Sequence, residues 1–275
     1  MKTILETKNL SKIFKSKSSW FEKEKKVHAV TDINISLKEN ETLGIVGESG
    51  CGKSTTGRSI IRLTQPTRGS VIFEGRELTN LSGKDMRPYR RQMQMIFQDP
   101  YSSLNPRMLV KDIVKESLDI NSTLTGNEKI EKVHWLIDKV GLAAEQSNRY
   151  PHEFSGGQRQ RIGIARALAT EPEIVIADEP VSALDVSIQA QIINLMMDLQ
   201  KEFDLSIIFI AHDLSVVKHI SDRVGVMNLG ELVEINETGQ IFSDPQHDYT
   251  KELLRAIPEP DPFGREERKR KRLNI

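Results

Sequence analysis

The chain has 275 residues, a length that fits one large domain or a core domain with a subdomain. Charged residues make up 28% and balance at 39 basic against 39 acidic, whereas nucleic-acid-binding proteins usually carry a basic excess, so we expect no nucleic-acid partner. The one cysteine excludes an intrachain disulfide framework and suits a reducing cytosol.

The hydropathy pattern gives no sign of a membrane span. No apolar run approaches the roughly 20 residues that cross a bilayer, and the longest, over 205–211, fits a buried strand. Residues 1–10 carry a charge inside every short apolar run, which is not typical of a signal peptide. We therefore expect any membrane association to be peripheral.

Apolar periodicity in the first half of the chain predicts strands followed by a helical region. The strands are expected over 27–37, 41–47 and 69–75, with a helix from Lys53 to a stop at Pro66. From about 104 to 150 helical spacing dominates, so we expect a helical subdomain, at about 104–165, inserted into the core.

The second half continues the alternation of strands and helices. We expect a helix after Gly157, a strand over 173–180, a helix with Asp185 as its N-cap, a strand over 205–213 and a hairpin around Gly230. This order favours an α/β fold whose mostly parallel sheet is covered on both faces.

Two charged stretches, 15–26 and 265–272, look locally disordered. Charge runs of this kind are most often solvated faces. Contact with anionic lipid headgroups is the alternative.

The stretch GESGCGKST at 47–55 fits the phosphate-loop template G-x-x-x-x-G-K-[ST], between a predicted strand and a predicted helix. Glycines allow backbone N–H groups to turn toward a phosphate, and the helix N-terminus adds roughly half a positive charge. We expect Lys53 to reach the β- and γ-phosphates and the Ser54 hydroxyl to bind Mg²⁺. The predicted ATP-binding residues here are Gly47, Glu48, Ser49, Gly50, Cys51, Gly52, Lys53, Ser54 and Thr55.

Cys51 lies inside this loop, at the start of the predicted helix. A helix N-terminus stabilises a thiolate, so the position predicts a lowered thiol pKa. We interpret the residue as a small filler rather than a redox group.

Polar side chains follow several predicted strands. Asp178 ends one strand and is expected to hold Mg²⁺ or its water, while the next residue, Glu179, is expected to act as general base on the attacking water. His212 ends another strand, and because carboxyl ends of parallel strands converge, we expect it near Lys53 and Asp178. Gln98 follows a further apolar run and either contacts Mg²⁺ or water, or caps the next turn.

Taken together, the motifs resemble those of the ABC ATPases. The phosphate loop, the Gln98 loop, FSGGQRQR at 154–161, VIADEP, SALD at 182–185 and His212 occur in that family's order and span nearly the whole chain. The resemblance implies a P-loop NTPase domain over 1–255, with an antiparallel β subdomain beside the mostly parallel core, and a C-terminal extension over 256–275.

The resemblance also implies that two such domains stack head to tail, so that each FSGGQ signature closes on ATP held by the other domain. Lys53, Ser54, Gln98, Asp178, Glu179 and His212 would then act in cis, with ATP and Mg²⁺ as ligands. The trans contacts would come from Ser155, Gly156, Gly157 and Gln158. Asp185 would couple the two sites, and Phe14 would stack on adenine.

Three longer stretches, ETLGIVGESGCGKSTTGRSI, MIFQDPYSSLNPRM and PQHDYTKELLRAIPEPDP, resemble the F-type ATPases of oligopeptide/dipeptide importers. This implies a related D-type ATPase as heterodimer partner, two membrane permeases and an extracellular binding protein, with the ATPase at the cytoplasmic face of the membrane. The surface near 98–110 would receive a permease helix. Some relatives hold an iron–sulfur cluster in a C-terminal cysteine cluster; this chain has no such cysteines, so none is expected.

Other functions are less favoured by the sequence. Nickel or metallophore importers share this type of ATPase and stay open as an alternative cargo. A soluble ABC protein of ribosomes or DNA would bring a second phosphate loop or sustained heptads, and the chain has neither. A P-loop kinase would not need the SGGQ and SALD elements.

Overall fold

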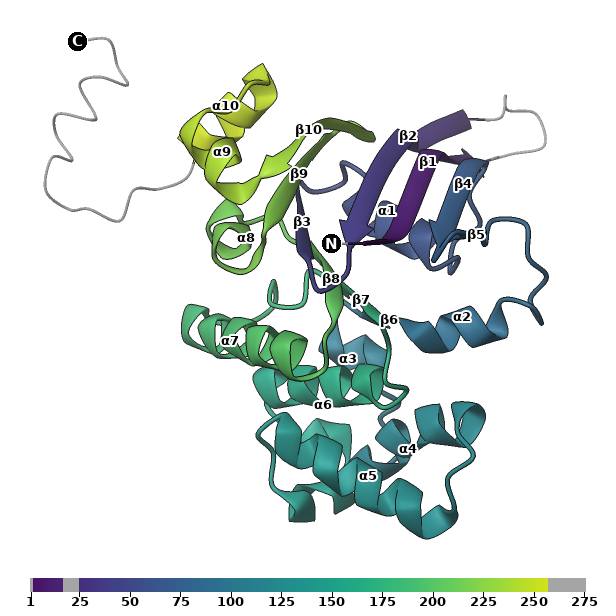
Figure 1. Ribbon diagram of the computed structural model, residues 1–275. Coiled ribbons are helices and arrows are strands. Elements are labelled where there is room, and N and C mark those ends of the chain that lie inside the picture. Colours follow the sequence, from purple (N-terminus) through teal and green to yellow (C-terminus); the bar gives the residue numbers. More distant parts are fainter. Residues whose placement is uncertain (1, 17–24, 257–275) are drawn as a thin grey trace, which may run out of the picture.

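The protein, a computed structural model, is described over residues 2–16 and 25–256 (Figure 1). Its core is a six-stranded sheet in the order β10-β9-β3-β8-β7-β6. The parallel strands are β3 (Thr42–Val46), β6 (Met93–Ile96), β7 (Ile174–Asp178), β8 (Ser206–Ile210) and β9 (Arg223–Asn228), and β10 (Glu231–Glu237) runs antiparallel to β9. All residues of β3, β7 and β8 are buried, which explains their continuous apolar runs.

A second, antiparallel sheet has the order β2-β1-β4-β5. Its strands are β1 (Thr3–Ser16), β2 (Lys25–Lys38), β4 (Arg68–Phe73) and β5 (Arg76–Glu77). Lys15 pairs with Lys26 and Ser16 with Lys25, so the ends of the 15–26 stretch are strand and the prediction of disorder there is wrong. The backbone pairing between β1 and β2 keeps these residues in the sheet although the stretch is rich in charged side chains. Residues 17–24 and the 265–272 stretch lie outside the described residues.

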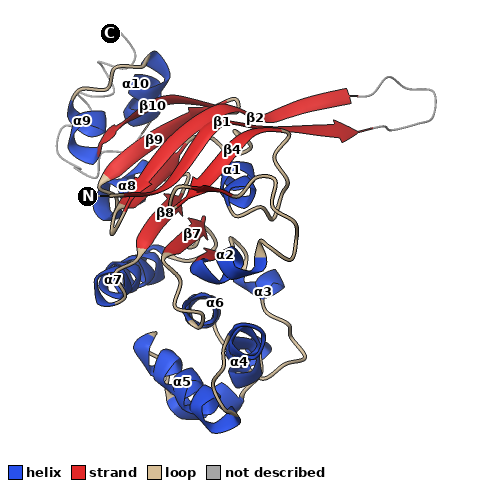
Figure 2. Ribbon diagram, turned by 45° about the vertical axis from the view of Figure 1, so that its right-hand side comes forward, coloured by secondary structure: helices blue, strands red, loops and turns tan. Residues whose placement is uncertain are grey.

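Helices pack against both faces of the six-stranded sheet (Figures 1 and 2). The helices are α1 (Lys53–Ile60), α2 (Arg87–Gln92), α3 (Pro100–Ser103), α4 (Val110–Asn121), α5 (Gly126–Lys139), α6 (Gly156–Leu168), α7 (Val186–Glu202), α8 (Leu214–Ile220), α9 (Thr238–Ser243) and α10 (Asp248–Arg255), with short 3₁₀ helices at Ala144–Asn148 and Pro151–Glu153. Among the described helices, none combines the length and the apolar character that a bilayer span requires.

The six-stranded sheet separates two apolar cores. In β7, Ile174 and Ile176 join the core shared with α1 and the antiparallel sheet, whereas Val175 and Ala177 join the core shared with α4 to α8. Successive strand residues point to opposite faces, so both faces are covered, as the sequence predicts. Figure 1 shows α4 and α5 at the end far from the antiparallel sheet. The boundary of a helical subdomain at about 104–165 stays a prediction.

Helix α1 is shorter than the sequence predicts, because it ends at Ile60 and not near Pro66. Arg62 has a left-handed backbone, with φ of 55°. Its guanidinium donates hydrogen bonds of 2.7 and 2.9 Å to the carbonyls of Leu78 and Leu81. A turn anchored in this way stops the helix before the proline is reached.

Candidate ATP site

The loop between β3 and α1 wraps around the amine of Lys53. Lys53 is almost fully buried, and its Nζ donates hydrogen bonds of 2.7 Å to the Gly47 carbonyl and 2.9 Å to the Glu48 carbonyl. Gly52 caps α1 without a side-chain hydrogen bond. The first turn of α1 therefore offers N–H groups and a nearby ammonium to an anion, which is the arrangement that binds phosphates.

Two glycines of the loop permit close packing against neighbouring backbone. A Cβ at Gly47 would lie 2.1 Å from the Met227 carbonyl oxygen, and one at Gly52 would lie 2.2 Å from the Ala29 carbonyl oxygen. Gly52 also has a left-handed φ of 108°, which side chains rarely tolerate. The loop could not hold this course with larger residues at either position.

Asp178 ends β7 directly beside the loop. The Ser54 hydroxyl donates a 2.6 Å hydrogen bond to Oδ1 of Asp178, and Arg58 Nη2 lies 3.3 Å from Oδ2. Burial raises the pKa of Asp178, against the hydrogen bond from Ser54 and the charge of Arg58, which lower it. A hydroxyl and a buried carboxylate are hard oxygen donors of the kind that Mg²⁺ prefers, so these residues fit that ion.

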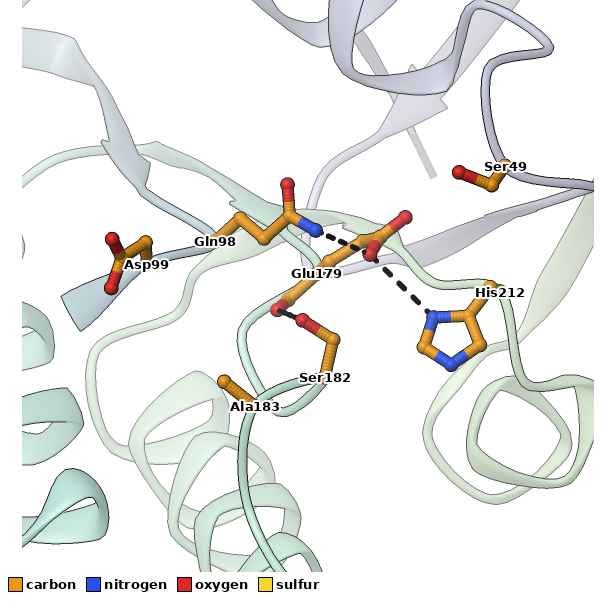
Figure 3. Close-up of a pocket in the computed structure, with 7 residues that line it drawn as sticks. All are labelled: Ser49, Gln98, Asp99, Glu179, Ser182, Ala183 and His212. Carbon is orange, nitrogen blue, oxygen red and sulfur yellow. Dashed lines mark hydrogen bonds and ion pairs between the residues drawn. The ribbon is translucent and has the colours of Figure 1, made fainter. Parts of the chain in front are cut away.

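Glu179 lies at the centre of an open pocket of about 460 Å³ (Figure 3). Its Oε2 accepts a 2.8 Å hydrogen bond from Gln98 Nε2 and lies 3.5 Å from His212 Nδ1, and its Oε1 lies 3.7 Å from Lys53 Nζ. The carboxylate is mostly buried, with 12% of the side chain exposed. The structure thus brings Lys53, Gln98, Glu179 and His212 together, as the convergence of strand ends predicts.

Ser49 of the phosphate loop, which is predicted to bind ATP, also lines the pocket, as do Ser182 and Ala183 of the SALD motif (Figure 3). Asp99 is the lining residue to which the sequence motifs assign no role. Asp99 also caps α3 by accepting the N–H of Tyr101 at 2.8 Å. Its position directly after Gln98 was the signal available in the sequence.

The signature segment stands apart from this pocket. Ser155 caps α6: its Oγ accepts the N–H of Gln158 at 3.3 Å, and Gln158 Oε1 accepts the N–H of Ser155 at 3.0 Å. Among the described residues, no hydrogen bond joins this capping pair to the phosphate loop. The positive end of α6 therefore faces outward, with Ser155 exposed.

Packing holds the signature helix against the Gln98 loop and α7. The Arg159 guanidinium lies 3.9 Å from the centroid of the Tyr101 ring. A Cβ at Gly157 would lie 2.5 Å from Ile188 of α7, so only glycine fits there without a shift. These contacts connect the signature to the loop that carries Gln98.

Asp185 and Phe14 lie outside the pocket. Asp185 is the N-cap of α7, as predicted, and accepts the N–H of Ile188 at 3.0 Å. The Ser187 hydroxyl, at 2.7 Å, is the main reason that the pKa of Asp185 is lowered. Phe14 is exposed on β1, with Lys12 Nζ 5.0 Å from its ring centroid. Its stacking on adenine stays a prediction.

The prediction of a lowered pKa for Cys51 is wrong. Only 6% of the residue is exposed, and burial raises the pKa of the thiol although the charge of Lys53 opposes this. Desolvation of the thiolate outweighs the helix terminus. The interpretation of Cys51 as a packed filler residue fits this burial.

Alkylation of Cys51 is accordingly expected to be slow at neutral pH and to block ATP binding once complete. The adduct would fill the space inside the loop, next to Gly47, where packing is already close. Mass spectrometry after iodoacetamide treatment, with and without ATP, measures the rate, and titration with ATP measures binding. The Cys51→Ser variant should bind ATP and resist the reagent. Normal ATP binding by fully alkylated protein would contradict this placement.

A phosphate loop between a strand and a helix, facing two acids at the end of another parallel strand of the same sheet, defines a P-loop nucleoside triphosphatase. Residues 30–182 match the ABC transporter family model, and residues 233–274 match the model for the oligopeptide/dipeptide transporter C-terminal region. The chain belongs to the ABC transporter family and is an ATPase of the ABC type.

Curated and solved relatives agree with this assignment. The chain is 61% identical over 238 residues to the "Oligopeptide transport ATP-binding protein OppF" of Bacillus subtilis, covering 86% of this chain and 78% of that protein. It is 51% identical over 270 residues to the "Dipeptide transport ATP-binding protein DppF" of Lactococcus lactis, covering 97% of this chain and 85% of that protein. A dimeric, ADP- and phosphate-bound cassette, MJ0796, superimposes with a TM-score of 0.76 at 28% identity, covering 86% of this chain and 99% of that one.

Proposed function

We propose that this chain is the F-type ATPase subunit of an importer that takes up oligopeptides or dipeptides, bound peripherally at the cytoplasmic face of the membrane. The observation that carries the proposal is the 61% identity to a protein named for oligopeptide transport. The match of residues 233–274 to the oligopeptide/dipeptide transporter C-terminal region supports it independently, because this region lies outside the ATPase motifs.

The proposed assembly pairs this subunit with a D-type ATPase and two permeases. The exposed cap at Ser155 supports a head-to-tail dimer, because an outward helix N-terminus suits the phosphates of an ATP held by another subunit. Gly156, Gly157 and Gln158 would contribute to the same trans contact, and Asp185, exposed at the start of α7, would lie beside it.

In the proposed reaction Glu179 is the general base. Its carboxylate would accept the proton of the water that attacks the γ-phosphate, while Gln98 and His212 hold the carboxylate and water in position. Lys53 would leave the loop carbonyls and bind the β- and γ-phosphates. Mg²⁺, when bound by Ser54, Gln98 and Asp178, would offset negative charge on the phosphates.

Deletion of the gene is expected to abolish uptake of a labelled peptide and to leave nickel uptake unchanged. Uptake of a radiolabelled tripeptide and of ⁶³Ni²⁺ into the deletion strain measures both. The wild-type gene should restore peptide uptake, and the Glu179→Gln gene should not. A deletion that lowers nickel uptake but spares peptides would transfer the assignment to a metal importer of the same family.

A further inference from the structure

A tyrosine of the C-terminal region reaches the phosphate loop. The hydroxyl of Tyr249, in the first turn of α10, accepts a hydrogen bond of 3.3 Å from the backbone N–H of Glu48. The two residues are 201 positions apart, and Tyr249 belongs to the part of the chain that matches the oligopeptide/dipeptide transporter C-terminal region. The contact joins that region directly to the ATP site.

Tyr249 is held firmly from β10. The carboxylate of Glu234 accepts the N–H groups of Gln246 at 2.8 Å and His247 at 3.0 Å. His247 Nδ1 then accepts the N–H of Tyr249 at 3.2 Å and caps α10. The side chains of Tyr249 and Leu253 pack against the apolar core that α4 to α8 share with the sheet. The hydroxyl is therefore presented by a fixed element.

The bond acts on one peptide group that is held at both ends. The carbonyl of Gly47 accepts from Lys53 Nζ at 2.7 Å, and the N–H of the same peptide, on Glu48, donates to Tyr249. Burial raises the pKa of Tyr249, so the phenol is neutral at physiological pH and its oxygen accepts this bond through a lone pair. If Lys53 turns toward the phosphates of ATP, as proposed above, the Gly47 carbonyl would lose this partner, and the bond from Glu48 to Tyr249 would be the one that still holds the peptide.

We propose that Tyr249 is a positioning residue for the phosphate loop: its hydroxyl fixes the Gly47–Glu48 peptide so that the loop keeps the shape that receives ATP. The C-terminal region thereby sets the affinity of the ATP site. This inference rests on the proposed role of residues 47–55 in binding ATP.

The test compares Tyr249→Phe, which removes the hydroxyl and keeps the ring, with Asp248→Asn on the same turn. A neutral hydrogen bond contributes roughly 1 kcal/mol, so Tyr249→Phe is expected to raise the Kd for MgATP about five-fold. Turnover at saturating ATP should stay within about two-fold of wild type, because Tyr249 touches no reacting group. The melting temperature should fall by no more than roughly 2–4 °C, the shift that a loss of about 1 kcal/mol produces in a domain of this size. Asp248→Asn should bind as wild type, since Asp248 is 98% exposed.

Isothermal titration of the full chain with MgATP measures the Kd, with Lys53→Met as a third variant. If Tyr249→Phe binds MgATP with unchanged affinity while Lys53→Met loses affinity, the positioning role of Tyr249 is overturned. The assignment of the phosphate loop as the ATP site then stands. An equal loss in Asp248→Asn also overturns the positioning role, because the helix and not the hydroxyl would be responsible. Normal binding by Lys53→Met would overturn the phosphate-loop assignment and the inference with it.

Discussion

Replacing Glu179 with glutamine is expected to lower ATP turnover at the site formed by this chain's phosphate loop by at least about 100-fold, the usual contribution of a general base. ATP binding should persist or tighten, because the amide keeps the size of the side chain and removes a negative charge from beside the γ-phosphate. The amide oxygen can still accept the hydrogen bond from Gln98, which is 2.8 Å long in the native protein. The local structure should therefore survive the change.

Steady-state release of phosphate measures the turnover, and size-exclusion chromatography with ATP detects a trapped closed dimer with the proposed D-type partner. Glu171→Gln is the matched control, because Glu171 is 61% exposed and forms a surface ion pair with Lys132 that contributes little. Full turnover in Glu179→Gln would exclude this residue as the base.

The convergence of the site was predictable because strand order and direction dictate it. Gln98, Glu179 and His212 follow β6, β7 and β8, which are parallel neighbours in the sheet, and Asp178 of β7 stands in register with Ile210 of β8. Short apolar runs reveal these strands, and polar residues after them must meet at one edge. The chemistry of the motifs then suggests the role of each residue.

Other features could not be predicted, because they depend on tertiary contacts that leave no local pattern. The bond from Glu48 to Tyr249 joins residues far apart in sequence, and the tyrosine itself reads as an ordinary residue of a terminal helix. The pKa of Cys51 depends on how completely the loop is covered, and the helix terminus alone suggests the opposite direction. Residues 15–16 and 25–26 are strand because β1 and β2 pair with each other there, although their charged composition favours disorder.

Replacing Ser155 with arginine is expected to leave this chain's own ATP binding intact and to disable the site at the partner's phosphate loop. The Ser155 cap contacts the Gln158 N–H and no group of the phosphate loop in the described part of the chain, so Lys53 and its neighbours should be unaffected. Across the proposed interface, the long cationic side chain would occupy the space of the partner's γ-phosphate. Loss of such a transition-state contact typically lowers turnover about 100-fold or more.

The design that isolates this effect combines both substitutions in the proposed heterodimer. Glu179→Gln silences the site that this chain's phosphate loop forms, so the residual turnover comes from the partner's loop and this chain's signature. Adding Ser155→Arg should remove that residual turnover. Ser155→Ala is the control for bulk: it loses the hydroxyl, with its trans contact and its cap of about 1 kcal/mol, but leaves the space of the partner's γ-phosphate open, so its turnover should fall less than that of Ser155→Arg. Weakened ATP binding by the isolated Ser155→Arg chain would contradict the outward placement of the signature, whereas undiminished residual turnover would exclude the head-to-tail arrangement.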